Sequence, residues 1–176
     1  MPHYLGQSFA PIIAYGSHGA IVHYEPTEGT DIPLGNESFL LADTGGHYLE
    51  GTTDITRTIV MGPVTKLQKQ HYTAVLMGNL RLMDAKFRYG LSGAHLDYLA
   101  REPLYRMGLD FKHGTGHGVG YLLNVHEGPN AIRSRVAEEG VFKQGMITSD
   151  EPGLYIEGAY GIRLCLLYTS DAADDM

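Results

Sequence analysis

The residues of this chain that could do chemistry are acids and histidines set among glycines. Asp43 closes the apolar run 39–42, Gly45-Gly46 turns the chain, and a Thr-rich segment returns through Asp54 to Thr58. This pattern predicts two strands whose carboxylates meet at one end. Close carboxylates repel, so a proton or a cation must separate them, and such oxygen donors suit Mn²⁺ or Mg²⁺. The alternative is that Asp43 is a turn acid and Asp54 an exposed strand residue.

Three histidines, His113, His117 and His126, lie in the glycine-rich segment 111–129. His113 and His117 share a face in a helix or in an extended segment, although the glycines disfavour a helix. The segment lacks the Gly-Lys-Ser/Thr ending of a phosphate-binding loop. It also lacks the zinc-binding pattern in which a second histidine follows His126-Glu127, because position 130 is Asn130. The remaining alternative is a glycine-rich turn with incidental histidines.

Two further candidates lie on or beside predicted strands. Glu151 ends the strand expected over 146–151, just before the turn Pro152-Gly153. A metal ligand would be placed there, although an isolated acid before such a turn is often only a turn residue. His23 lies in a strand predicted over Ala20–Tyr24, which follows another over Ile12–Tyr15. A lone strand histidine is more often structural than functional.

Two helices are predicted between these segments. The first runs from its N-cap Thr65 to about Arg88, ends at Gly90, and has a core-facing stripe at Leu76, Leu80, Met83 and Phe87. The second runs from its cap Ser92 to about Met107, with inward-facing Leu96, Leu99 and Leu104. Pro103 predicts a kink or an early break near Arg101. Residues 25–36 are predicted to form a surface loop.

Composition indicates an ordinary water-soluble domain. The 176 residues are 43% hydrophobic and 19% charged, and no run is apolar enough to predict a membrane helix or a signal peptide. The net charge of −7 without a basic stripe argues against nucleic acid as a partner. The single cysteine, Cys165, excludes an internal disulfide and favours a reducing compartment, so we expect a cytoplasmic protein.

Four segments together resemble the pita-bread metallopeptidases, most closely the Xaa-Pro aminopeptidases: the aspartate pair at 43–58, HGTGHGVG at 113–120, NVHEGP at 124–129 and SDEPG at 149–153. The resemblance runs from about Tyr4 to Leu164. It implies an α+β fold with curved antiparallel sheets, helices outside and metal ions between the sheets. Residues 1–164 would then be part of a catalytic domain that is incomplete at both ends.

The resemblance also implies a site and a reaction. Two divalent ions, Mn²⁺ before Zn²⁺ or Co²⁺, would share a water that attacks peptides with proline second and releases their N-terminal residue. The implied metal ligands are Asp43, Asp54, His117 and Glu151. The implied catalytic residues are Glu151, as general base, with His126 and His113. The implied substrate-binding residues are His23, His113, His126 and Arg163. A prolidase, or a binding module without catalysis, is the alternative, and the resemblance leaves a homodimer open.

The sequence departs from that family at Cys165. The family has a bridging Glu two residues after an arginine, and here Gly161-Ile162-Arg163-Leu164 is followed by Cys165. Residues 165–176 instead resemble the translation of a sequencing adapter, because TGT-CTC-TTA-TAC-ACA-TCT encodes Cys-Leu-Leu-Tyr-Thr-Ser. We therefore expect a non-native tail at 165–176, and a chain that is marginally stable and inactive or nearly so.

Overall fold

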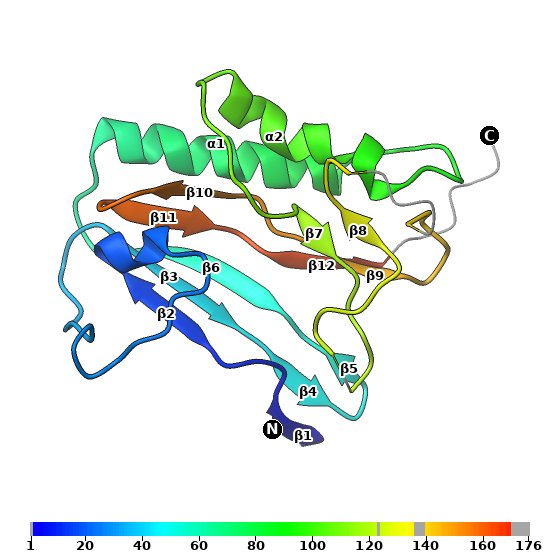
Figure 1. The fold of residues 1–176 in the computed structure, drawn as a ribbon, viewed down its shortest axis with the longest axis horizontal. Coiled ribbons are helices and arrows are strands. Elements are labelled where there is room, and N and C mark those ends of the chain that lie inside the picture. The colour runs from blue at the N-terminus through cyan, green and yellow to red at the C-terminus, as the bar shows by residue number, and fades with distance from the viewer. Residues whose placement is uncertain (1, 123, 136–139, 170–176) are drawn as a thin grey trace.

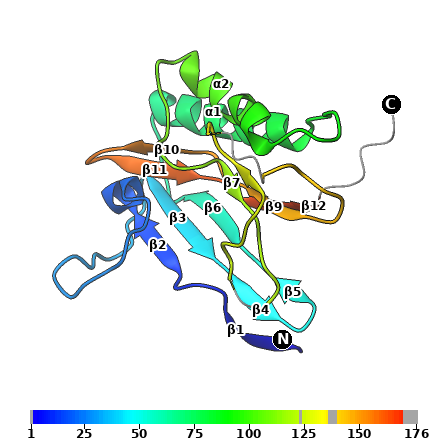
Figure 2. The same ribbon diagram turned by 45° about the vertical axis from the view of Figure 1, so that its right-hand side comes forward.

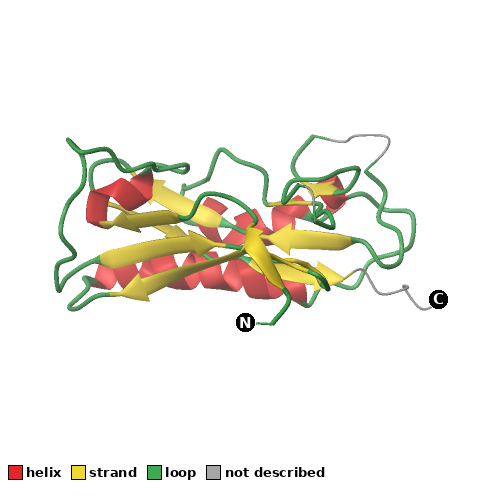
Figure 3. Ribbon diagram, turned by 90° about the horizontal axis from the view of Figure 1, so that it is seen from below, coloured by secondary structure: helices red, strands yellow, loops and turns green. Residues whose placement is uncertain are grey.

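The computed structural model describes residues 2–122, 124–135 and 140–169, and it packs helices against one side of several small antiparallel sheets (Figure 1). The turned view shows α1 and α2 on the same side of the strands (Figure 2), and from below the strands lie in front of the helices (Figure 3). The strands are β1 Tyr4–Gln7, β2 Ile12–Tyr15, β3 Phe39–Thr44, β4 Gly46–Tyr48, β5 Gly51–Thr52, β6 Ile55–Val60, β7 Gly116–His117, β8 Ala131–Ile132, β9 Ile147–Asp150, β10 Gly153–Ile156, β11 Tyr160–Arg163 and β12 Leu166–Thr169. The helices are α1 Lys66–Met83 and α2 Asp97–Tyr105, with short 3₁₀-helices η1 Gly16–Ala20 and η2 Gly93–His95. The predicted α+β class is confirmed.

The sheet β2-β3-β6 carries the aspartate pair. In its register Asp43 of β3 lies opposite Thr56 of β6, and Leu41 lies opposite Thr58. Side chains alternate along a strand, so Asp43 shares the buried face with Leu41, while Thr56 and Thr58 are the buried positions of β6. Asp54 precedes β6 and is only 6% exposed. The alternative of a solvent-exposed Asp54 is therefore excluded.

Helix α1 begins at the predicted N-cap, but the side that it buries differs in part from the predicted one. Its N-cap Thr65 forms a capping box with Gln68. The helix ends at Met83 rather than near Arg88. Of the predicted core stripe, Leu76 and Phe87 pack against the core, whereas Leu80 and Met83 are 44% and 46% exposed. The cause is Gly78, where a Cβ atom would lie 2.2 Å from the carbonyl oxygen of Ala100 in α2. The two helices approach along this small-residue side instead. No described helix is long and apolar enough to cross a membrane.

Two other element predictions need correction. The expected break near Arg101 is absent, because α2 continues through Pro103, and the interruption lies earlier, at η2. The buried Leu96 and Leu104 do face inward, as predicted. The strand expected over Ala20–Tyr24 does not form. Its first residue closes η1, whose turn bonds the Ile21 amide to the carbonyl of His18.

The buried His71 of α1 makes stability sensitive to acid. Its Nδ1 lies 2.9 Å from the Tyr160 hydroxyl, and burial lowers its pKa from the ordinary 6.5. The folded chain therefore binds fewer protons than the unfolded chain, so this histidine costs stability as the pH falls below 6.5. We expect His71→Asn to lower the melting temperature at neutral pH but to flatten its decline between about pH 7 and about pH 5. The measurement is the melting temperature of both proteins at several pH values. An equally steep decline in the variant and in the unaltered chain would contradict this prediction.

Candidate metal centre

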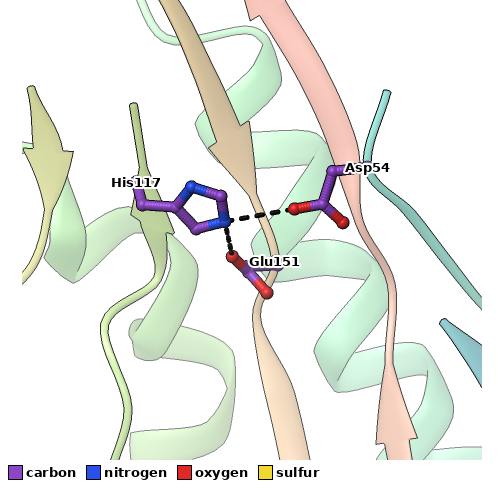
Figure 4. A group of neighbouring side chains, drawn as sticks. All are labelled: Asp54, His117 and Glu151. Carbon is purple, nitrogen blue, oxygen red and sulfur yellow. Dashed lines mark ion pairs between the residues drawn. The ribbon is translucent and has the colours of Figure 1, made fainter. Parts of the chain in front are cut away.

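Three side chains from separate segments converge between the sheets (Figure 4). Asp54 precedes β6, His117 lies in β7, and Glu151 follows β9. The Nε2 atom of His117 lies 3.1 Å from Oδ2 of Asp54 and 3.0 Å from Oε1 of Glu151. In the described part of the chain, these residues form the one group of three acidic, histidine or cysteine side chains whose ligand atoms all lie within 4.8 Å of one another. Such separations suit donors around one cation.

The His117 ring is oriented for coordination. Its Nδ1 donates to the carbonyl of Gly118 at 2.9 Å, which leaves the Nε2 lone pair facing the two carboxylates when the ring is neutral. Within the described ranges, Nε2 has no partner in hydrogen-bond geometry. Burial by itself would lower the pKa of His117, but Asp54 and Glu151 raise it to about 10. The ring is therefore charged in the metal-free chain at neutral pH, and a metal ion must displace that proton.

Ser149 joins the strands that carry His117 and Glu151. Its buried hydroxyl accepts from the His117 amide at 3.0 Å and donates to Oε1 of Glu151 at 2.9 Å. Burial would raise the pKa of Glu151, but bonding to His117 and Ser149 lowers it below its ordinary value. Glu151 is therefore an anion. Ser149 was not among the predicted site residues, although its place two residues before Glu151 on a predicted strand puts both on one face.

Gly116 allows β7 to approach β9. A Cβ atom at Gly116 would lie 1.9 Å from the Ser149 carbonyl oxygen. We expect Gly116→Ala to displace His117 from Glu151 and to weaken divalent metal affinity by about 10–100-fold, as loss of supporting contacts does at metal sites. Gly114→Ala is the matched control, because the nearest atom to its new Cβ lies at 3.5 Å. Equal metal affinities for the two variants, measured by calorimetric titration, would refute this role.

Asp43 lies outside the three-donor group and pairs with Arg163. Their Oδ2 and Nη2 atoms are 2.8 Å apart, and both residues are buried. Burial raises the pKa of Asp43, which Arg163 opposes. The second oxygen, Oδ1, is buried and has no hydrogen-bond partner in the described residues. Three of the four predicted ligands therefore converge, and the fourth makes a buried ion pair beside them.

The remaining predicted site residues lie around this centre or the ion pair. The His126 ring lies 4.3 Å from that of His117, and burial, the charge of His117 and a smaller effect of His23 lower its pKa. Nε2 of His113 lies 2.8 Å from the hydroxyl of Tyr155, and that hydroxyl accepts a hydrogen bond from Nη1 of Arg163. The substrate roles expected for these residues stay predictions.

Cys165 occupies the position where the family pattern has its bridging Glu. The side chain is fully buried, and Sγ lies 3.8 Å from Oδ1 of Asp54. The Cys165 amide donates to the carbonyl of Thr56 at 3.1 Å, which holds residue 165 beside the metal centre. The described donors thus fit one ion well. They do not form a second group for another ion.

The model of metallopeptidase family M24 matches residues 2–168. The chain belongs to this family. A probable Xaa-Pro aminopeptidase P of Verticillium alfalfae is 48% identical over 92% of the chain, and aminopeptidase P1 of Lotus japonicus is 47% identical over the same share. The chain spans 26% and 24% of the lengths of these two relatives.

Solved structures of the family confirm the pita-bread fold. An X-prolyl aminopeptidase of Caenorhabditis elegans, described as a cytosolic enzyme with a di-nuclear active site, superposes with a TM-score of 0.92 at 42% identity. That match covers 96% of this chain and 28% of the other. A prolidase of Pyrococcus furiosus superposes with a TM-score of 0.83 at 34% identity, covering 94% of this chain and 47% of the other. The resemblance to Xaa-Pro aminopeptidases inferred from the motifs is confirmed.

Proposed function

We propose that residues 1–164 are part of the catalytic domain of a Xaa-Pro aminopeptidase, which removes the N-terminal residue from peptides with proline in the second position. The observation that carries this proposal is the convergence of Asp54 and Glu151 on Nε2 of His117, at 3.1 and 3.0 Å. The similarity to proteins named aminopeptidase P supports it, and it favours this activity over that of a prolidase. The nematode relative is described as a cytosolic enzyme, which supports a cytoplasmic location for this protein.

The residues of the centre have separate roles in the proposed hydrolysis. Divalent ions, when bound, supply a water of lowered pKa and polarise the scissile carbonyl. Glu151 is an anion with a free oxygen beyond its bonds to Ser149 and His117, so it can accept the proton of the attacking water. His126 lies beside His117 and can donate to the substrate. With a carboxylate at position 165, this oxygen-rich set would favour Mn²⁺.

We propose that the chain as it stands hydrolyses such peptides at a negligible rate, because Cys165 replaces a carboxylate and residues 165–176 are foreign to the domain. Residues 166–169 nevertheless pair with β9 as β12, and residues 170–176 lie outside the described part. The first assay is hydrolysis of a proline-second tetrapeptide by the purified chain with Mn²⁺. Turnover at the rate of a full-length relative would refute the proposed inactivity.

A chimera tests the activity of residues 4–164 in a complete enzyme. This segment would replace the matching segment of the Verticillium alfalfae relative, which keeps that protein's own residue at position 165. We expect the chimera to cleave the tetrapeptide and Asp54→Asn in it to be inactive. Cleavage of Xaa-Pro dipeptides alone would assign prolidase activity instead. A folded chimera that binds metal and cleaves neither substrate would favour a binding module.

A further inference from the structure

A buried asparagine holds the chain segment that carries His126. This residue is Asn130, which lies four positions after His126. We propose that Asn130 is a positioning residue: it fixes the returning limb of the hairpin between β7 and β8 to strand β9, and it thereby places the His126 ring against His117. The inference rests on the proposed function, in which His126 takes part, but its first test needs neither substrate nor metal.

The hairpin is closed at its base by hydrogen bonds of Gly118. Beyond the paired strands β7 and β8, the Gly118 amide donates to the carbonyl of Asn130 at 2.8 Å. The Gly118 carbonyl accepts from the amide of Glu127 at 2.8 Å and from Nδ1 of His117 at 2.9 Å. One oxygen therefore orients the His117 ring and also holds the residue next to His126.

The Asn130 side chain joins this base to β9. Asn130 is 5% exposed, and its carboxamide nitrogen donates to the carbonyl of Ile147 at 3.0 Å and to the hydroxyl of Thr148 at 2.6 Å. The same Ile147 carbonyl accepts from the amide of Val119 at 3.1 Å. Both limbs of the hairpin thus bind one oxygen of β9, and both hydrogens of the carboxamide nitrogen have an acceptor.

The link from this anchor to His126 is short. It consists of residues 127–129, which include a proline whose ring fixes its φ angle. The tip of the hairpin is attached separately, because the Leu122 amide donates to the hydroxyl of Thr52 at 3.1 Å. At the base, β7 lies beside both β8 and β9 (Figure 1). The anchor therefore sets the direction from which the chain brings the His126 ring to 4.3 Å from that of His117.

Nuclear magnetic resonance of the metal-free chain tests this proposal. We expect cross-relaxation between the ring protons of His117 and His126 in the unaltered chain, and its loss in Asn130→Ala. Thr148→Val removes one acceptor of the carboxamide and should weaken the signal, whereas Thr148→Ser keeps the hydroxyl and should preserve it. Cross-relaxation that persists in Asn130→Ala would overturn the proposal. If that variant fails to fold, the two Thr148 variants decide by the same signal.

Asn79→Ala is the matched control. Asn79 is 2% exposed and donates to the carbonyl of Asp150, which is also in β9, but it does so from helix α1. This variant should lose stability and keep the cross-relaxation between the two rings. An equal loss of the signal in Asn79→Ala and Asn130→Ala would show a general loosening of β9, and it would overturn the specific role of Asn130.

Kinetics of the chimera described above give a second measurement. Asn130→Ala should lower its kcat by about 10–100-fold, as misplacement of a reacting group does, and should change its Mn²⁺ affinity little. In a His126→Ala background the same substitution should have little further effect, because Asn130 acts through His126. Fully additive losses would overturn the proposal. A chimera without any activity would refute the peptidase proposal, while cross-relaxation in the chain would still decide on Asn130.

Discussion

Replacement of Arg101 by Leu is expected to lower the free energy of unfolding by about 3–5 kcal/mol, the cost of removing one partner from a buried ion pair. Arg101 is 6% exposed and donates to Oδ2 of Asp97 at 2.7 Å. It also donates to the carbonyls of Phe111 and His113 at 2.6 and 2.8 Å, and its guanidinium lies 4.0 Å from the centre of the Phe111 ring. Among the described residues, the variant leaves the buried Asp97 carboxylate with the Thr115 hydroxyl as its one side-chain partner.

Urea denaturation measures this loss, with the midpoint and slope compared between variants. Arg106→Leu is the matched control on the same helix. Arg106 also pairs with an acid, Glu102, but its side chain is 75% exposed, so solvent replaces the lost contact. Similar losses in the two variants would show that the Arg101 network does not hold the segment before His117. We expect Arg106→Leu to lower the free energy of unfolding much less than Arg101→Leu does.

The second large effect is the loss of metal-induced stabilisation in Asp54→Asn. A ligand that binds only the folded chain stabilises it by about 2.7 kcal/mol at a concentration of 100 Kd. Oδ2 of Asp54 lies 3.1 Å from Nε2 of His117, within the three-donor group. An amide in its place removes the charge and one acceptor oxygen. We expect Zn²⁺ to raise the melting temperature of the unaltered chain and to leave that of the variant nearly unchanged.

Thermal melts with and without Zn²⁺, each after treatment with a chelator, check this expectation. Asp84→Asn provides the control, because Asp84 is an exposed acid at the C-terminal cap of α1. It should respond to Zn²⁺ as the unaltered chain does. A full metal response in Asp54→Asn would remove Asp54 from the centre. If Zn²⁺ raised the melting temperature of neither Asp54→Asn nor Asp84→Asn, the cause would be the general loss of negative charge rather than loss of a ligand.

Local patterns predicted the elements that carry the site. The strands at 12–15 and 39–44 and the N-cap Thr65 follow from alternation and capping chemistry, and motif order led to Asp54, His117 and Glu151. Leu80 and Met83 were wrongly predicted to be buried, because the buried side of α1 depends on Gly78 meeting Ala100 of another helix. The spacing of hydrophobic residues within one helix gives no information on such a contact with another helix.

Hydrogen bonds and ion pairs between residues far apart in the chain could not be predicted from the sequence either. The pair of Asp43 with Arg163 joins positions 120 residues apart, and it forms only after β11 packs beside β3. The four bonds of Arg101 likewise depend on how the segment after α2 folds back. The i, i+4 spacing of Asp97 and Arg101 was the one local signal for that network.

The most direct test is an anomalous difference map from crystals of the chain grown with Zn²⁺, recorded at the zinc absorption edge. If Asp54, His117 and Glu151 hold a divalent ion, the map will show a strong peak between them. That peak will lie about 2.0–2.2 Å from Nε2 of His117 and from an oxygen of each acid. A zinc peak elsewhere, or none between these three side chains at saturating Zn²⁺, would contradict this assignment.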